Sequence, residues 1–327
     1  MRRRLLTALV ALAAAASTVG CGSDRHASTP RQQPDTTTSS SAVPRSTITT
    51  TSTSTSTTTP ATTTTAPVDV FALRPPAAAT DPGALADQIL EAEQTIRDTS
   101  STEIQVAEAA LSQQVAYRQL GDHPDWDAEV VTALPEELQS VTVLNAAARR
   151  EFRSMHTRLS STLPAWRIVE PVPVEELRSI YDEAAAAFHI PWQYLAAINL
   201  VETGSGRIRG TSSAGAQGPM QFMPSTWEAY GAGGDVNDTH DAIMGAARYL
   251  AANNGAADID NALFHYNHSS HYVQGVKLYA DLVDEHPQAF LGYYGWGVWY
   301  LTDAGEVYLP VGYEQSAPIA VADYRSP

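Results

Sequence analysis

Apolar residues recur every three or four positions along much of the chain after residue 80, which is the period of amphipathic helices. Thr80, Asp81 and Pro82 offer a helix cap and a first-turn proline, so the first helix begins there. We predict a helical accessory region over residues 80–166, with Asn145 as a polar interruption of its third helix that can set register. The positions that define its three helices are Leu85, Ile89, Ala92 and Ile96; Ile104, Ala107, Leu111 and Val115; and Leu138, Val141, Asn145, Ala148, Phe152, Met155 and Leu159.

A Pro-rich joint over residues 163–173 precedes a second helical series. One helical face carries Val174, Leu177, Tyr181, Ala184 and Phe188, and Pro191 opens the next helix. A Gly-rich loop over 204–218 follows, and further helices are expected over 242–252 and 273–283. Strands over 298–301 and 307–309 are expected to form a β-hairpin around residues 303–305. The pattern predicts a mainly α domain over 167–315 with a C-terminal β-hairpin, and a tail over 316–327.

The amino terminus has the pattern of an export signal. Residues 2–4 are arginines, and residues 5–19 are apolar and uncharged. About 15 apolar residues fit a signal peptide better than a membrane span, which needs about 20. The small residues before Cys21 are similar to the lipobox of bacterial lipoproteins, in which the cysteine is acylated. We predict a signal peptide over 1–20 and a lipid anchor on Cys21, on an exported protein that faces the cell wall; the alternative is an ordinary secretory signal cleaved nearby.

Low-complexity sequence follows the cysteine. Between positions 46 and 65, 17 of the 20 residues are Ser or Thr, and no charged residue occurs over 46–68. Such a segment cannot bury enough apolar surface to offset its chain entropy. We therefore expect residues 21–79 to be a flexible, lipidated spacer with a reach of roughly 30–40 Å.

Composition narrows the function classes. The 327 residues contain 20 Lys and Arg against 36 Asp and Glu, a formal net charge of −16. This balance argues against a nucleic-acid binder or an anionic-membrane binder, because both need a basic surface. A single cysteine excludes a disulfide framework within the chain and a multi-cysteine zinc site. We expect a monomer whose membrane contact is made only through the lipid anchor.

One carboxyl group carries the candidate chemistry. Glu202 comes at the end of a mostly apolar helix. Desolvation on an apolar helix face raises the pKa of a carboxyl group, and the negative end of the helix dipole raises it further. A carboxyl group that stays protonated near neutral pH can act as the general acid in glycosidic cleavage. On position alone, however, a surface glutamate is the commoner interpretation.

The following segment changes that balance. Residues 212–227 read SSAGAQGPMQFMPSTW, and residues 262–269 read ALFHYNHS. The first resembles the S-x-x-G-A-x-G-x-M-Q-x-M-P-x-T signature of soluble lytic transglycosylases and goose-type lysozymes, and the second contains the Tyr-Asn pair of that family. The resemblance covers roughly residues 190–280. Two departures are Thr203, where Ser is commoner, and Pro219, which removes a backbone donor.

The resemblance implies a lysozyme-like, mainly helical domain that cleaves peptidoglycan glycan strands. Glu202 would be the sole acid/base at the bond between N-acetylmuramic acid and N-acetylglucosamine. No second acid occurs close to it in the motifs, and the family resolves this through the substrate's own acetamido group, which leaves 1,6-anhydro ends and needs no metal or cofactor. The other implied site residues lie along the sugar-binding groove or around the reacting sugar; they are Met220, Gln221, Ser212, Tyr266 and Asn267.

Other interpretations remain open. Within enzymes, lysozyme-type hydrolysis is the nearer alternative; outside them, a non-catalytic lipoprotein could use the groove as a glycan clamp. His265, His268 and His271 suggest a metal site, but no carboxylate ligand is evident nearby. Residues 235–246 resemble a calcium loop but lack its central glycine and final glutamate. We therefore predict no metal. Eight aromatic residues over 290–313 are interpreted as core rather than as a sugar platform.

Overall fold

The structure is a computed structural model that describes residues 69–325 of the chain. The predicted signal peptide, Cys21 and most of the spacer lie outside these residues, so those predictions stay predictions. Eleven α-helices and six short strands occur in the described part, which confirms the mainly α fold class. None of its helices is both long and apolar enough to cross a membrane.

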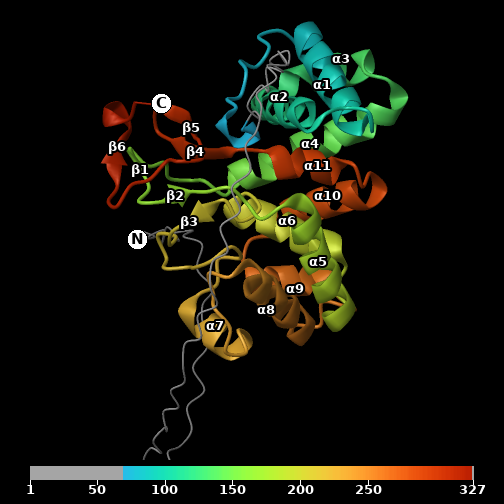
Figure 1. Cartoon of the computed structure of the whole chain (residues 1–327). Helices are drawn as coiled ribbons and strands as arrows, with labels where there is room; N and C mark the ends of the chain where they lie inside the picture. The colour runs from blue at the N-terminus through green and yellow to red at the C-terminus, as the bar shows by residue number, and fades with distance from the viewer. Residues whose placement is uncertain (1–68, 326–327) are drawn as a thin grey trace, which may run out of the picture. The chain divides into compact units, whose positions relative to one another are not determined.

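Figure 1 shows the order of the elements along the chain. The helices are α1 Pro82–Arg97, α2 Glu103–Asp122, α3 Asp127–Ala133, α4 Glu136–Ser154, α5 Val174–Phe188, α6 Trp192–Thr203, α7 Pro224–Tyr230, α8 Thr239–Ala252, α9 Ile259–Tyr266, α10 Ser270–Glu285 and α11 Ala289–Gly295. The strands are β1 Thr162–Leu163, β2 Arg167–Ile168, β3 Ile208–Arg209, β4 Val298–Thr302, β5 Gly305–Leu309 and β6 Ile319–Ala320.

The first helix begins where the sequence predicts, and the caps of α1 and α2 are both local. The carboxylate of Asp81 accepts the backbone N–H of Ala84 at the start of α1 (2.9 Å). Thr102 and Gln105 form a capping box at the start of α2. The first four apolar-face positions predicted for the third helix are buried in α4. The helix ends at Ser154, however, so Leu159 lies beyond it and is 38% exposed.

The second helical series is also close to its prediction, with three additional short helices. Asp238 caps α8, and α10 begins three residues before the expected position. The sequence pattern missed α7, α9 and α11, which have only seven, eight and seven residues. Helices this short contain about two turns, too few for a periodic pattern to stand out.

Three two-stranded antiparallel sheets lie beside the helices. The predicted hairpin is confirmed as β4 and β5, with Val298 opposite Leu309. The Pro-rich joint is more than a connection, because it contains β2 and the second residue of β1. β1 pairs with β6, so the predicted tail is part of a sheet, and β2 pairs with β3. A small apolar core joins these strands; its buried members are Leu163, Ile168, Val298, Leu309 and Tyr313.

The main hydrophobic core runs through both predicted regions. Buried side chains of α1, α2 and α4 join those of α5, α6, α8, α9, α10 and α11 in one cluster. Direct helix contacts cross the predicted boundary at residue 166, since α4 packs on α10 and α2 packs on α11 (Figure 1). Residues 80–166 therefore share one core with residues 167–315 in this structure, although they were predicted as separate regions. Four of the C-terminal aromatic residues are buried, as expected for core positions; they are Phe290, Tyr293, Trp296 and Tyr313.

Candidate active site

Glu202 lies on the last turn of α6. Leu195 and Ile198 of this helix are fully buried, and the helix ends at Gly204, whose φ of 61° is left-handed. Glycine adopts this conformation at the least steric cost, so as the C-cap it ends α6 directly after Thr203. Glu202 itself is partly exposed, between the buried face and the surface.

The carboxylate of Glu202 has one hydrogen-bond partner in the described part of the chain. The hydroxyl of Tyr272, on the first turn of α10, donates to Oε1 at 2.8 Å. Tyr272 is 1% exposed, and burial raises the pKa of its hydroxyl well above the usual value, so it stays a donor. Sequence reasoning missed Tyr272. Its only local signal is an aromatic residue three positions after the Ser269 cap, and this signal does not reveal a partner 70 positions away.

Burial raises the pKa of Glu202 from 4.5 to about 7, and the hydrogen bond from Tyr272 opposes that shift. No charged side chain of residues 69–325 contributes to it. The cause is therefore the desolvation that the sequence predicts. A carboxyl group with this pKa can donate a proton and take one back near neutral pH.

Hydrogen bonds within the loop after β3 stabilise its conformation. The hydroxyl of Ser212 accepts the backbone N–H groups of Ala214 (3.2 Å) and Ala216 (3.0 Å). Gln217 and Phe222 pair across an antiparallel bridge, with a tight turn between them. The side chain of Ser212 thus shapes the loop in this structure, and no hydrogen bond joins it to Glu202 within the described residues.

The turn itself contains Gly218, Pro219, Met220 and Gln221. At Gly218 (φ 73°) a Cβ would lie 1.8 Å from the Val236 carbonyl oxygen, so no larger residue fits. Gln221 has a φ of 50°, and its side-chain amide donates to the Gly218 carbonyl (3.0 Å). Met220 is 0% exposed in the main core. Its side chain therefore does not line an open surface, contrary to the expectation from the resemblance.

A buried pair of hydrogen bonds on the Pro219 carbonyl, which we call the clasp, joins this turn to α6 next to Glu202 in sequence. The carbonyl of Pro219 accepts the Asn199 amide (2.9 Å) and the Thr203 hydroxyl (2.6 Å). The hydroxyl of Tyr181 in turn donates to the Asn199 amide oxygen (2.7 Å). Both departures from the family pattern therefore take part in one contact. Thr203 supplies the hydroxyl that Ser would supply, and Pro219 contributes its carbonyl.

Tyr266 and Asn267 end α9 near the same carboxylate. The Tyr266 hydroxyl donates to the Met220 carbonyl (2.6 Å), and its ring stacks on that of Tyr272 at a centroid distance of 6.4 Å. Burial and the neighbouring Glu202 raise the pKa of Tyr266 well above the usual value. Asn267 is the partly exposed C-cap of α9. Of the five predicted substrate-binding residues, the structure thus brings Tyr266 near Glu202 and bonds its hydroxyl to the backbone of Met220.

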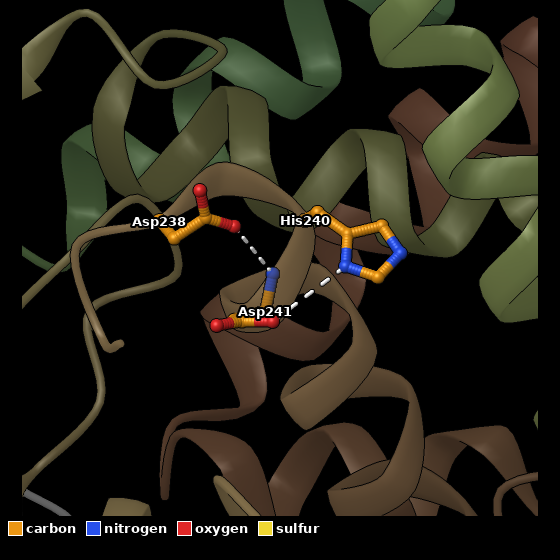
Figure 2. A group of neighbouring side chains, drawn as sticks. All are labelled: Asp238, His240 and Asp241. Carbon is orange, nitrogen blue, oxygen red and sulfur yellow. Dashed lines mark hydrogen bonds and ion pairs between the residues drawn. The ribbon is translucent and has the colours of Figure 1, made fainter. Parts of the chain in front are cut away.

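Potential metal ligands gather at the start of α8, where Figure 2 shows Asp238, His240 and Asp241. Each side chain already has a structural contact. Asp238 accepts the Asp241 backbone N–H (2.9 Å), Asp241 accepts that of Asp235 (2.9 Å), and His240 Nε2 lies 3.2 Å from Glu183 Oε2. These contacts explain the group as the capped start of a helix.

The three histidines of the α9–α10 segment do not converge. His265 and His268 lie with ring centroids 6.3 Å apart, and His271 Nδ1 lies 2.6 Å from Glu151 Oε2. Within residues 69–325, no group of metal-ligand type includes them. The prediction that the chain binds no metal stays a prediction.

Comparison with known proteins gives one result. Residues 179–281 match the transglycosylase SLT domain. No curated protein and no solved structure matches the chain. The matched range contains Glu202, the 212–223 loop and the Tyr266-Asn267 pair, and it supports a transglycosylase-type enzyme that binds peptidoglycan. The family that residues 179–281 match is therefore the one to which the motifs point.

Proposed function

We propose that the protein is a peptidoglycan lytic transglycosylase in which Glu202 is the sole acid/base. The observation that carries the proposal is a partly buried carboxyl group with a pKa of about 7, held by one neutral donor and influenced by no other charge of the described residues. Two-carboxylate glycosidases need a second acid as base or nucleophile. The surroundings of Glu202 favour a mechanism that needs only one.

In the first step Glu202 is the general acid. It gives its proton to the oxygen that joins N-acetylmuramic acid to N-acetylglucosamine, and the bond from the muramoyl C1 to that oxygen breaks. The substrate's acetamido oxygen attacks C1 and forms an oxazolinium. Tyr272 then donates to the carboxylate that remains, which stabilises the charge formed at Glu202.

In the second step Glu202 is the base. It takes the proton of the muramoyl 6-hydroxyl, the oxygen of that group attacks C1, and the bond from C1 to the acetamido oxygen breaks. The product has a 1,6-anhydro ring, Glu202 is protonated again, and no water is consumed. A pKa near 7 suits both steps, because neither protonation state is strongly disfavoured at neutral pH.

The remaining predicted residues have supporting tasks in this proposal. Gln221 and Asn267 are partly exposed amides that can hydrogen-bond sugar hydroxyl and acetamido groups. Ser212 shapes the loop that carries Gln221. The buried clasp on Pro219 keeps that loop at the end of α6.

The cellular setting is part of the same proposal. Export by the signal peptide, acylation of Cys21 and the Thr/Ser-rich spacer would hold the enzyme at the membrane within reach of the wall. The change Cys21→Ala should abolish incorporation of a labelled fatty acid and release the exported protein from membranes. Retention of the label in this variant would refute the anchor and leave the enzymatic proposal intact.

Mass spectrometry of products released from purified sacculi tests the reaction. The full chain should release muropeptides with anhydro ends, and Glu202→Gln should release none. Glu176→Gln is a matched control, because Glu176 is an exposed glutamate on α5 and should leave the products unchanged.

Two other results would replace the proposal. Reducing-end products that depend on Glu202 would show hydrolysis of lysozyme type. Binding to sacculi without any release, equal for the wild-type chain and Glu202→Gln, would show a glycan-binding lipoprotein.

A further inference from the structure

The last turn of α4 lies against the first turns of α10, where Tyr272 is found. Phe152 of α4 contacts the Tyr272 ring edge-on, with centroids 6.5 Å apart and planes at 83°. The same phenylalanine stacks on Tyr279, about two turns further along α10, at 5.6 Å and 19°. Phe152 therefore contacts the tyrosine that holds Glu202, although it lies outside the matched range 179–281.

Gly275 makes this approach feasible. A Cβ at this position would lie 2.5 Å from Cζ of Phe152 and within 2.9 Å of two more ring atoms. A glycine inside a helix costs about 1 kcal/mol relative to alanine. Gly275 lies in the interior of α10, so its presence there is explained by the aromatic ring that occupies the space of its side chain.

A second contact joins the same two turns. His271 Nδ1 lies 2.6 Å from Glu151 Oε2, so the residues next to Tyr272 and Phe152 are also paired. On the α9 side, the ring of Tyr266 stacks on Tyr272. Tyr272 thus has aromatic neighbours from two helices, and only one of them, α9, belongs to the matched domain.

We infer that Phe152 is a positioning residue, whose ring on α4 holds Tyr272 in hydrogen-bond contact with Glu202. The inference rests on the proposed function, since it assigns α4 a part in orienting the proposed acid. Phe152 acts through Tyr272 alone and does not reach the reacting atoms.

The expected change in the pH profile follows from the effect of the Tyr272 hydrogen bond on the pKa of Glu202. That hydrogen bond lowers the pKa of Glu202, so a loosened Tyr272 lets the pKa rise. The titratable groups around Tyr272 are Glu202, Tyr266 and the His271–Glu151 pair, and Arg149 of α4 acts on the nearby Tyr279. None of these groups is changed by a substitution at Phe152.

The test is the pH dependence of glycan cleavage by the full chain carrying Phe152→Ala. We expect kcat to fall about tenfold, with the alkaline limb of the profile moved to higher pH. Phe152→Tyr, which keeps the ring, should retain the wild-type profile. Phe188→Ala is the matched control, because Phe188 is also a partly exposed phenylalanine near a helix end but packs on Arg248, not on Tyr272.

A double variant separates positioning from general loosening. In a Tyr272→Phe background, Phe152→Ala should move the profile no further, since there is no hydroxyl left to position. Gly275→Ala, which displaces the ring, should shift the profile in the same direction as Phe152→Ala.

Failure of the inference and failure of the proposed function look different. A Phe152→Ala profile identical to that of Phe188→Ala, or an equal shift in the Tyr272→Phe background, would overturn the inference while Glu202→Gln remains inactive. Full activity of Glu202→Gln would instead overturn the proposed function.

Discussion

Two glutamates, one in the N-terminal helices and one in the matched domain, have opposite surroundings. Glu93 of α1 is 1% exposed, and its two oxygens accept four hydrogen bonds. The donors are Arg97 (3.1 and 2.8 Å), Gln113 (2.9 Å) and Tyr117 (2.5 Å). Glu202 is held by Tyr272 alone and has no cation beside it among the described residues.

The difference separates a structural carboxylate from the proposed acid/base. A buried charge that is paired and fully hydrogen-bonded fixes the helices around it. A partly buried carboxyl group with one neutral donor has a raised pKa, so it keeps its proton up to near-neutral pH and can exchange it there. The same residue type therefore joins α1 to α2 in one region and is available for chemistry in the other.

The largest expected effect comes from Glu202→Gln. Loss of the acid/base should lower kcat by about 10³-fold or more, measured as anhydro product released per unit time. The variant should also be more stable than the wild-type chain at pH 8. The carboxyl ionises near 4.5 when unfolded and near 7 when folded, so its ionisation destabilises the fold as pH rises through that range.

Thermal unfolding at two pH values checks the stability part of this prediction. Below pH 4 the carboxyl is protonated in both states, and the variant and the wild-type chain should unfold at the same temperature. A stability gain that is equal at pH 4 and pH 8 would contradict the raised pKa.

Next in size is Glu93→Ala, which removes the acceptor of four hydrogen bonds and leaves Arg97, Gln113 and Tyr117 without it. We expect a loss of about 3 kcal/mol in the free energy of unfolding, measured by denaturant titration. The folded variant should keep the wild-type pH profile of cleavage. An altered profile at a temperature where the variant is folded would show that the two glutamates are coupled.

Tyr272→Phe should have a smaller effect on rate, with a diagnostic pH shift. Removing the hydroxyl should lower kcat about tenfold, because the bond to the ionised carboxyl is lost. The pKa of Glu202 should rise, so the acid form persists longer and the alkaline limb moves to higher pH. An alkaline limb that moves to lower pH would refute this role of Tyr272.

The smallest effect is expected at the clasp. Thr203→Val removes the hydroxyl that donates to the Pro219 carbonyl and should cost about 1 kcal/mol of stability. Thr203→Ser keeps the hydroxyl and should be nearly neutral. Equal losses in the two variants would assign the effect to packing of the methyl group instead of the hydrogen bond.

Much of the fold could be predicted because its signals are local. Asp81, Thr102 and Asp238 cap helices within three residues, and the β4–β5 hairpin follows from a turn between two short apolar runs. The pairing of β1 with β6 joins residues 162 and 320, and no pattern within either segment indicates its partner. The apolar face of a helix likewise does not indicate which other helix packs on it. The hydrophobic core shared by residues 80–166 and 167–315 was therefore not predicted.

The candidate site divides in the same way. Glu202 could be predicted from an apolar helix and a motif, both of which are contiguous in sequence. The proposed roles of Tyr272 and Phe152 depend on contacts of α10 with α6 and α4. These contacts join residues far apart in the sequence, and no local sequence pattern indicates them. Met220 shows the reverse case, because its motif position was clear but its side chain points into the core.

The core shared by α4, α6 and α10 bears on how this chain could be shortened or recombined. A fragment trimmed to residues 179–281 would expose the apolar sides of α6 and α10 to water and would lack the ring of Phe152. Exchanging that fragment alone between homologous chains would therefore disturb the hydrophobic core of both recipients. The preceding helices, including α4, would have to be exchanged together with it.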